Sequence, residues 1–318
     1  MQLSPFTLLI GANGTGKSNF LRLLKKLSKV QKRTRLEILQ GLSNSSDLPR
    51  HHSFSKEEQK IVVHNDKGQR YEFTRNAVPD SHHASILTQA LPVFPKDTES
   101  EPLSELYDVR IFSLNPHKAG ESEPLELSPT VKEDGTGIVQ VLDSLKTGDR
   151  EDLFNKIEEL FKDYIPEVKK LSFVPVDNAK RLQIRDTNLP NSVLISELSE
   201  GMQLALMMIT ILYQEEKPSL ICIEDIDRGL HPKLYQQIVE LCFDIAEMED
   251  VQIIATTHNP YLISEFKDHE SAVIVVEKTE GKTTFTTLEE KIDGLPHEDM
   301  PLGTLWASGL LTAVPQNV

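Results

Sequence analysis

The sequence contains few cysteines and no long hydrophobic run. Its two cysteines, Cys222 and Cys242, both fall within apolar segments. This usage excludes the disulfide framework of a small secreted domain and indicates buried thiols in a reducing compartment. No apolar stretch approaches the roughly 20 residues that a membrane-spanning helix requires. The N-terminal segment MQLSPFTLLIG leads directly into a glycine loop, which differs from a cleavable signal. We therefore expect a cytoplasmic protein that does not enter a membrane.

Basic residues are also in deficit, since 34 lysines and arginines face 49 acidic residues and the net charge is −15. This balance excludes a general basic surface for nucleic acid but leaves room for a local patch. One segment, 20–36, carries several basic residues and no acid. It is a candidate phosphate-contacting surface, and a solvated helix face is the equally weighted alternative. Its basic residues are Arg22, Lys25, Lys26, Lys29, Lys32, Arg33 and Arg35.

Internal repeats and coiled-coil heptads are absent as well. What is present is an alternation of apolar strands with helices, typical of an α/β protein. The length of 318 residues allows a sizeable core. Strands are predicted at 6–10, 109–114, 220–224 and 251–257, helices at 18–30, 136–147, 150–164, 202–213 and 233–247, and β pairs at 61–75, 168–187 and 272–288.

The segment GANGTGKS at 11–18 lies between a predicted strand and a predicted helix, and it fits the pattern G-x-x-x-x-G-K-[ST] completely. Its glycines let backbone N–H groups approach phosphates closely, and the following helix dipole favours their charge. Lys17 is expected to reach the β- and γ-phosphates and Ser18 to place its hydroxyl on Mg²⁺. The predicted nucleotide-binding residues here are Asn13, Gly14, Thr15, Gly16, Lys17 and Ser18.

Two further segments place polar side chains where strands end. ICIEDID (221–227) puts Glu224 and Asp225 after an apolar strand, at the edge where open α/β sheets bind ligands. VQIIATTHNP puts His258 directly after the next buried strand. A lone histidine is more often structural, but this position favours a role in the same site. The other histidines, including His51, His52, His82 and His83, lie in irregular polar segments without metal-site spacing.

A fourth segment, LSEGMQ at 198–203, opens a strongly apolar predicted helix. Ser199 and the backbone of Gly201 stand at the start of that helix, where a phosphate can accept hydrogen bonds. The plainer interpretation is that Ser199 is an ordinary N-cap. The two interpretations are compatible.

These segments resemble motifs of the ABC/RecF/OLD/SMC-like class of P-loop ATPases, whose compact prokaryotic members are called AAA family ATPases. The resemblance covers most of the chain. Transporter ATPases carry a different element where this chain has GLHP, so GLHP favours the DNA-repair and defence branch. The segments that carry the resemblance are GANGTGKS (11–18), LSEGMQ (198–203), IEDIDRGLHP (223–232), ATTHNPYLI (255–263) and LGTLWASGLL (302–311).

The resemblance implies an ABC-type P-loop ATPase head with a mixed β-sheet core, an antiparallel β subdomain and a helical signature lobe. All of 1–318 would form one head. It would comprise a P-loop lobe at 1–75, an inserted helical and β lobe at 76–200, and a lobe at 201–318 that carries the acidic strand end and the histidine. Because heptads are absent, we expect no long coiled-coil arms.

The resemblance also assigns catalytic roles, with ATP and Mg²⁺ as cofactors. Glu224 would support Mg²⁺ together with Ser18, Asp225 would orient the attacking water, and His258 would contact the γ-phosphate. The family writes its acidic pair Asp-Glu, whereas this chain has Glu-Asp. Since Asp225 is one methylene shorter than glutamate, we predict turnover about 10- to 100-fold below an ideally positioned enzyme.

In this class the signature residues Ser199 and Gly201 contact the nucleotide held by a facing subunit, so the resemblance implies a homodimer with two composite ATP sites. The chain departs from the family in two further respects. Ten residues precede Gly11, where the family has a β-hairpin, and only Asn115 stands where a Q-loop glutamine is expected. No TOPRIM-like nuclease domain follows, so we expect a separate nuclease- or TOPRIM-like effector chain.

We therefore predict a Mg-ATP-dependent ATPase that acts as a motor or switch in DNA repair or anti-phage defence. The alternative is the ATP-binding subunit of a membrane transporter, which GLHP and the missing glutamine disfavour. A P-loop kinase or GTPase is a third possibility, but the sequence contains no NKxD-like motif and that assignment would leave LSEGMQ unexplained.

Overall fold

The computed structural model describes residues 3–31, 59–64, 70–75, 108–121, 128–176, 179–249, 251–279, 281–293, 300–309 and 311. The chain divides into two compact units, one formed by Met1–Lys25 with Asp108–Val318 and the other by Lys26–Tyr107. These boundaries fall at other places than those of the subregions 1–75, 76–200 and 201–318. That subdivision stays a prediction about how the head is organised.

A six-stranded sheet with the strand order β11-β10-β1-β9-β8-β4 forms the centre of the first unit. From β10 to β4 all neighbouring strands pair in parallel, and β11 is antiparallel at the edge. Every residue of β1 and β8 is buried, as expected for parallel strands that are covered on both faces. The strands are β1 (Phe6–Ile10), β4 (Val109–Phe112), β8 (Leu220–Ile223), β9 (Gln252–Thr257), β10 (Val273–Thr279) and β11 (Lys282–Thr287).

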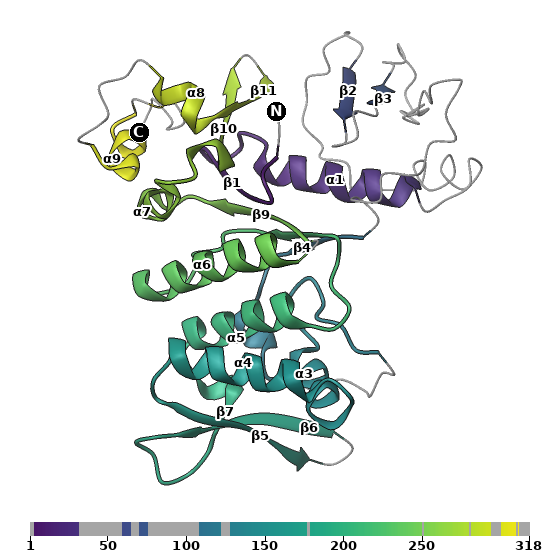
Figure 1. The fold of residues 1–318 in the computed structure, drawn as a ribbon, viewed down its shortest axis with the longest axis vertical. Helices are drawn as coiled ribbons and strands as arrows, with labels where there is room; N and C mark the ends of the chain where they lie inside the picture. The colour runs from purple at the N-terminus through teal and green to yellow at the C-terminus, as the bar shows by residue number, and fades with distance from the viewer. Residues whose placement is uncertain are drawn as a thin grey trace, which may run out of the picture. The chain divides into compact units, whose positions relative to one another are not determined.

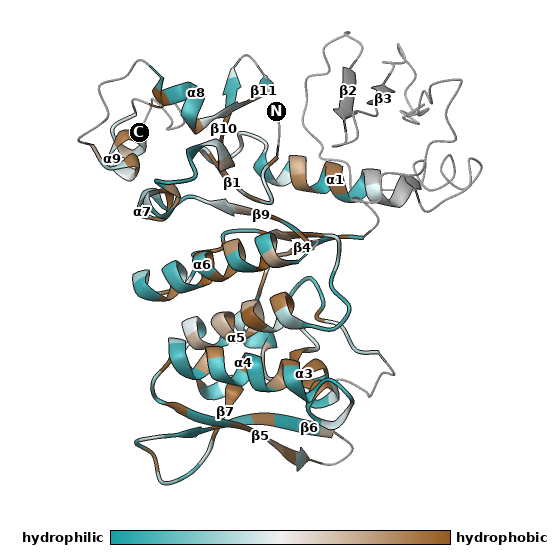
Figure 2. Ribbon diagram, viewed as in Figure 1, coloured by the Kyte–Doolittle hydropathy of each residue, from teal (hydrophilic) through white to brown (hydrophobic). Residues whose placement is uncertain are grey.

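Helix α6 (Pro232–Met248) contacts β1 and β9 and, on its other side, α5 (Glu200–Tyr213). Figure 1 shows α6 between these strands and α5. Every residue of α5 from Gln203 to Leu212 is buried, and its apolar residues stand out in brown in Figure 2. A helix that is apolar all round must be enclosed on all sides. The sequence prediction of a strongly apolar helix here is confirmed.

Helices α3 (Ile138–Thr147) and α4 (Glu151–Tyr164) cover α5 on the side away from α6. The buried face of α4 consists of Phe154, Ile157 and Phe161, at the spacing of an amphipathic helix. Beyond them lies a second sheet of β5 (Val168–Val176), β6 (Ala179–Asp186) and β7 (Val193–Leu194). The sequence predicted the β5–β6 pair, but β7 has only 2 residues and is too short to show a period.

The predicted strands and helices are confirmed, with shifted ends. The strand predicted at 109–114 ends at Phe112, because the Ser113 N–H donates to the carbonyl of Glu133 at 2.8 Å instead of to the sheet. In the second unit β2 (Gln59–His64) and β3 (Arg70–Arg75) form the predicted antiparallel hairpin. Its turn at 65–69 and the segment 76–104 lie outside the described residues.

The remaining helices are the long α1 (Lys17–Gln31), the short α7 (Pro260–Ile263), α8 (Leu288–Ile292) and α9 (Leu302–Ala307), and the 3-10 turns η2 (Pro116–Lys118), η3 (Ile195–Glu197), η4 (Ser264–Phe266) and η5 (Glu270–Ala272). Within the part of the chain that the structure describes, none of the helices combines the length and apolarity needed to cross a membrane. Cys222 and Cys242 are free and buried, and burial raises the pKa of each thiol to about 12. The predicted buried thiols are thus confirmed.

Helix α9 lies against α7 at one buried glycine, Gly303. A Cβ atom at this position would lie 2.3 Å from the carbonyl oxygen of Pro260. We therefore expect Gly303→Ala to lower the free energy of unfolding by about 1–3 kcal/mol, the usual cost of overpacking. Denaturant unfolding measures the change. Thr304→Ala, an exposed change on the same helix, is the control and is expected to unfold like the wild type.

Candidate functional site

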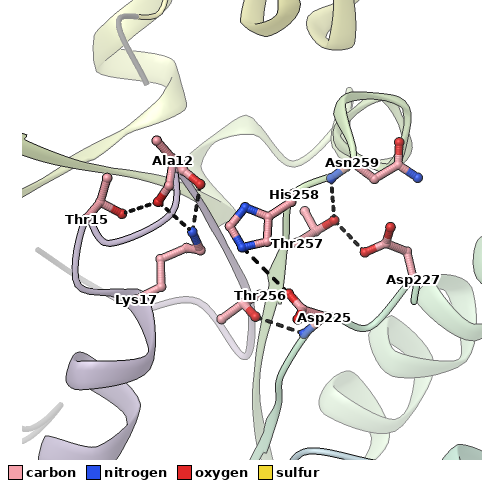
Figure 3. A network of polar contacts seen from close by, with 10 residues as sticks. Ala12, Thr15, Lys17, Asp225, Asp227, Thr256, Thr257, His258 and Asn259 are labelled. Carbon is pink, nitrogen blue, oxygen red and sulfur yellow. Dashed lines mark hydrogen bonds and ion pairs between the residues drawn. The ribbon is translucent and has the colours of Figure 1, made fainter. Parts of the chain in front are cut away.

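Three neighbouring parallel strands bring the predicted site residues to one edge of the central sheet. The loop after β1 leads into α1, Glu224 and Asp225 follow β8, and His258 follows β9. The order β1-β9-β8 puts these strand ends side by side, which is where open α/β sheets bind ligands. Figure 3 shows the resulting cluster of polar side chains.

Strand register sets the pairing at this edge. Ile10 pairs with Thr257, so Gly11 and His258 follow at the same level. Ile223 pairs with Ala255, so the acidic loop begins beside the end of β9. A slip of one residue would turn each side chain to the opposite face of the sheet.

The glycine loop is shaped by its contacts with the β10–β11 hairpin. A Cβ atom on Gly11 would lie 2.3 Å from the carbonyl oxygen of Val276, and one on Gly16 would lie 2.8 Å from Thr283 Oγ1. Thr283 also donates a hydrogen bond to the carbonyl of Thr15 at 2.8 Å. Gly14 has open space around it but a φ of +79°, a conformation that glycine adopts without strain. The motif predicted the glycines, whereas Thr283 carries no local signal.

Lys17 is folded back into the loop. Its side chain is buried, and Nζ donates hydrogen bonds to the carbonyls of Gly11 at 2.6 Å and Ala12 at 3.1 Å. Burial lowers the pKa of the ammonium group to about 8, against an opposing effect of the Asp225 carboxylate. A buried cation with a lowered pKa gains from any anion that enters the loop.

Asp225 has a φ of +50°, unlike any other non-glycine residue in the described ranges. Aspartate and asparagine tolerate this left-handed conformation better than most residues. Its backbone N–H donates to Thr256 Oγ1 at 2.9 Å, which ties the acidic loop to β9. One carboxylate oxygen of Asp225 lies 3.8 Å from His258 Nε2. The structure therefore brings together the two residues predicted to act on the water and on the γ-phosphate.

The imidazole of His258 is exposed at the surface of the site, and the partial loss of water around it is the main reason that its pKa falls below the ordinary value. The charge of Lys17 lowers the pKa further, while Asp225, Asp227 and a hydrogen bond to the Gly11 backbone act in the opposite direction. The net shift favours a neutral ring at neutral pH, which can still donate a hydrogen bond to a phosphate oxygen.

A second hydrogen-bonded chain lies beside this pair and was missed by sequence reasoning. Thr257 Oγ1 donates to a carboxylate oxygen of Asp227 at 2.6 Å and accepts from the Asn259 N–H at 2.9 Å. The Asn259 side chain in turn caps α7 by accepting from the Tyr261 N–H at 3.0 Å. Figure 3 shows the chain running from the acidic loop to α7 past His258.

The segment LSEGMQ forms the start of α5, where Ser199 is an exposed N-cap that accepts from the Met202 N–H at 3.4 Å. A Cβ atom on Gly201 would lie 2.9 Å from the carbonyl oxygen of Gly229, so this glycine lets the signature approach the GLHP segment. Gln203 is buried and donates to the carbonyls of Ile195 and Leu198, both at 3.0 Å. The N-cap interpretation is confirmed, and the nucleotide contact of Ser199 and Gly201 stays a prediction.

Ser18 and Glu224, the predicted Mg²⁺ residues, are half-buried, Ser18 in the first turn of α1 and Glu224 directly after β8, and Asn13 and Gly14 are exposed on the loop. A hydroxyl and a carboxylate suit Mg²⁺, which takes its remaining ligands from water and substrate phosphates. No group of three or more histidine, cysteine, aspartate or glutamate side chains suited to a metal was found when the described residues were searched. The donor set therefore fits Mg²⁺ bound with a nucleotide better than an all-protein cage.

The structure describes three basic side chains of the segment 20–36, those of Arg22, Lys25 and Lys26. Lys25 forms an ion pair with Glu133, while Arg22 is exposed and Lys26 is half-buried. The side chains of Lys29, Lys32, Arg33 and Arg35 lie outside the described part. Asn115 uses its side chain to accept from the His117 N–H at 3.1 Å and cap η2. Its assignment as a Q-loop residue stays a prediction from position.

Fold and site together define a P-loop ATPase of the ABC/SMC-like class. The crystal structure of the SmcHead bound to the C-winged helix domain of ScpA is similar to this chain with a TM-score of 0.51 and 16% identity, over 92% of this chain and 94% of that one. The Smc head domain of Pyrococcus furiosus, bound to the C-terminal domain of ScpA, gives a TM-score of 0.50 and 13% identity, over 92% and 93%.

Within the ABC/SMC-like class, the sequence matches one particular family. Residues 6–264 match the family described as "AAA domain, putative AbiEii toxin, Type IV TA system". Because the match spans most of the chain, the protein belongs to this AAA family. No curated protein matches the sequence.

The lowered pKa of Lys17 predicts how nucleotide affinity depends on pH. A bound triphosphate favours the cation and raises its pKa, so binding takes up a proton once the free lysine has lost one. ATP affinity should be constant below pH 8 and then fall by about tenfold per pH unit. Calorimetry from pH 6.5 to 9.5, in buffers of different ionisation enthalpy, measures both the affinity and the proton uptake.

Lys17→Arg is the matched control, because arginine stays charged throughout this range. Its affinity should change little between pH 7.5 and 9.5. A wild-type affinity as flat as that of the arginine variant would contradict the lowered pKa.

Proposed function

We propose that this protein is a Mg-ATP-dependent ATPase that closes around two ATP molecules between two copies of the chain. It would act as a motor or switch in DNA repair or anti-phage defence, together with a separate effector chain. The observation that carries the proposal is the convergence of the buried Lys17, Asp225 and His258 on one sheet edge. Membership in an AAA family of P-loop ATPases supports ATP hydrolysis.

Each residue of the site has a role that follows from its position. Lys17 would exchange the Gly11 and Ala12 carbonyls for phosphate oxygens. Asp225 would accept a hydrogen bond from the attacking water and orient it, and the neutral ring of His258 would donate to the γ-phosphate. Mg²⁺, held by Ser18 and Glu224 together with the nucleotide, would neutralise charge on the phosphates.

The position of the signature supports the proposed dimer. Ser199 is exposed at the start of α5, and α6 stands between α5 and the strand that leads into the glycine loop. A signature on a different layer from its own P-loop suits contact with the nucleotide of a second copy. The exposed N-cap and the N–H groups of the first turn of α5 would supply that contact.

The biological role is supported by the family and by the GLHP segment. The description of the family names a toxin of a toxin–antitoxin system, which favours defence. The CbiO1 protein of Clostridium perfringens, part of the ABC transporter complex CbiONQ, gives a TM-score of 0.41, too low to support the transporter alternative. Nucleic acid remains a candidate ligand of the segment from Arg22 to Arg35, although Lys25 is already paired with Glu133.

The composite site predicts a change of mass with nucleotide. Asp225→Asn should bind Mg-ATP, hydrolyse it slowly and accumulate as a stable dimer, because asparagine tolerates the left-handed backbone of this position but lacks the carboxylate. Light scattering with and without Mg-ATP measures the mass. Lys17→Ala should fail to bind and should not dimerise with ATP.

Adding Ser199→Arg to Asp225→Asn should spare ATP binding and prevent the dimer, since the bulky side chain fills the place of the facing phosphate. Asn191→Arg, an exposed change in the same region, is the control and should dimerise normally. A mass that stays the same with ATP, for the chain purified alone, would refute the composite site.

The role as a switch predicts that an effector depends on ATP. Nuclease activity of the product of the neighbouring gene, measured with this protein, ATP and DNA, should fall at least tenfold with Lys17→Ala. Activity that depends on neither ATP nor DNA would count against the proposal. Co-purification with an integral membrane protein would instead favour the transporter alternative.

A further inference from the structure

Two consecutive threonines at the end of β9 tie the acidic loop to the strand that carries His258. Thr256 accepts hydrogen bonds from the loop on both its side chain and its carbonyl, from the N–H groups of Asp225 at 2.9 Å and Ile226 at 3.0 Å. Thr257 donates its hydroxyl to Asp227 at 2.6 Å. These hydrogen bonds therefore fix the turn from Asp225 to Asp227 to the end of β9.

The single hydroxyl of Thr257 makes two hydrogen bonds, one as a donor and one as an acceptor. The same oxygen that donates to Asp227 accepts the Asn259 N–H at 2.9 Å. Thr257 is fully buried, so water cannot replace either partner. A hydrogen bond from a hydroxyl to a carboxylate is stronger than one between neutral groups. His258 lies between Thr257 and Asn259 in the chain. The Thr257 hydroxyl, which donates to Asp227 and accepts from the Asn259 N–H, therefore fixes the backbone before and after His258.

We infer that Asp227 and Thr257 are positioning residues for ATP hydrolysis, which act through the backbone at 257–259 to hold His258 beside Asp225. The inference rests on the proposed ATPase function and gives a role to two residues of the motif segments that had none. Neither residue belongs to the glycine loop or to α1, which would make most of the contacts with the phosphates. Their loss should therefore slow the chemical step and leave nucleotide binding nearly unchanged.

The electrostatics of the site provides a second readout. The charges that act on His258 are those of Lys17, Asp225 and Asp227, and the carboxylate of Asp227 raises the pKa of the imidazole. Asp227→Asn keeps an oxygen that can accept from Thr257 but removes the charge. It should lower the pKa of His258, as measured by NMR titration in the absence of nucleotide, and retain more of the rate than Asp227→Ala.

The central test removes the Thr257 hydroxyl with little change of shape. Thr257→Val should lower kcat by about 10- to 100-fold, since small misplacements in an active site have effects of this size. The dissociation constant for ATP should stay within about threefold, as expected when an interaction specific to the transition state is lost. Thr257→Ser restores the hydroxyl and should recover most of the rate.

Thr210→Val is the matched control. Thr210 is also fully buried, and its hydroxyl donates to the Leu206 carbonyl at 2.7 Å within α5, away from the acidic loop. The Thr210→Val variant shows how much the loss of a buried threonine hydroxyl lowers the melting temperature when the site itself is unchanged. Thr257→Val should lower the melting temperature at least as much as Thr210→Val, because it loses two hydrogen bonds instead of one, and only Thr257→Val should lower kcat.

A double-mutant cycle tests whether the two residues act as one unit. Asp227→Ala and Thr257→Val should each slow hydrolysis, and the double variant should be no slower than the worse single variant. If the fold reductions in kcat of the two single variants multiply in the double variant, the two residues act independently and the inferred unit is refuted. A kcat of Thr257→Val equal to that of Thr210→Val would overturn the positioning role. If Thr257→Val does not fold, the kcat of Asp227→Ala is compared with that of Thr210→Val instead, since Asp227 is half-exposed and its loss is easier to accommodate.

The outcomes separate this inference from the proposed function. A wild-type protein that neither binds nor hydrolyses ATP refutes the ATPase proposal itself. An active wild type whose kcat is unaffected by Asp227→Ala and Thr257→Val refutes only the positioning role. The pKa of His258 responds to Asp227→Asn whether or not ATP is hydrolysed, so this readout does not depend on activity.

Discussion

The parallel register of β1, β9 and β8 is the constraint on which the site depends. Because Ile10 pairs with Thr257, the glycine loop and His258 begin at the same level of the sheet, and because Ile223 pairs with Ala255, the acidic loop begins beside Thr256 at the end of β9. Parallel strands need long crossover connections, and here these contain α6 and the helices around α5. The fold therefore brings together residues that are far apart in the chain while their backbones remain buried and paired.

At this edge of the sheet, burial and the neighbouring carboxylates shift the pKa values of Lys17 and His258 in opposite directions. Burial lowers the pKa of Lys17, and burial together with the charge of Lys17 lowers the pKa of His258 and favours its neutral form. The carboxylate of Asp225 opposes both shifts, and that of Asp227 opposes the shift of His258. A site with this balance suits a polyanion with a divalent cation, because an incoming phosphate stabilises the ammonium group of Lys17 and finds a neutral donor beside it.

Much of the fold could be predicted from the sequence because its signals are local. The apolar run of β8, the glycine loop before α1 and the amphipathic face of α4 each lie within a short stretch. The contacts that complete the site have no such signal. Thr283 supports the glycine loop from β11, and Gly201 approaches Gly229 across two elements. The 2-residue β7 pairs only because β6 offers it an edge.

The sequence alone determined the kind of site, since a glycine loop with Lys17 and acids after a buried strand have a chemistry that depends on a few adjacent residues. Only the tertiary structure decided how these parts act together. The hydrogen bonds from Thr256 and Thr257 to the acidic loop depend on the register of strands that are distant in sequence. Register is set by how the strands pair and by how β1 and β9 pack against α6, and no short segment encodes it.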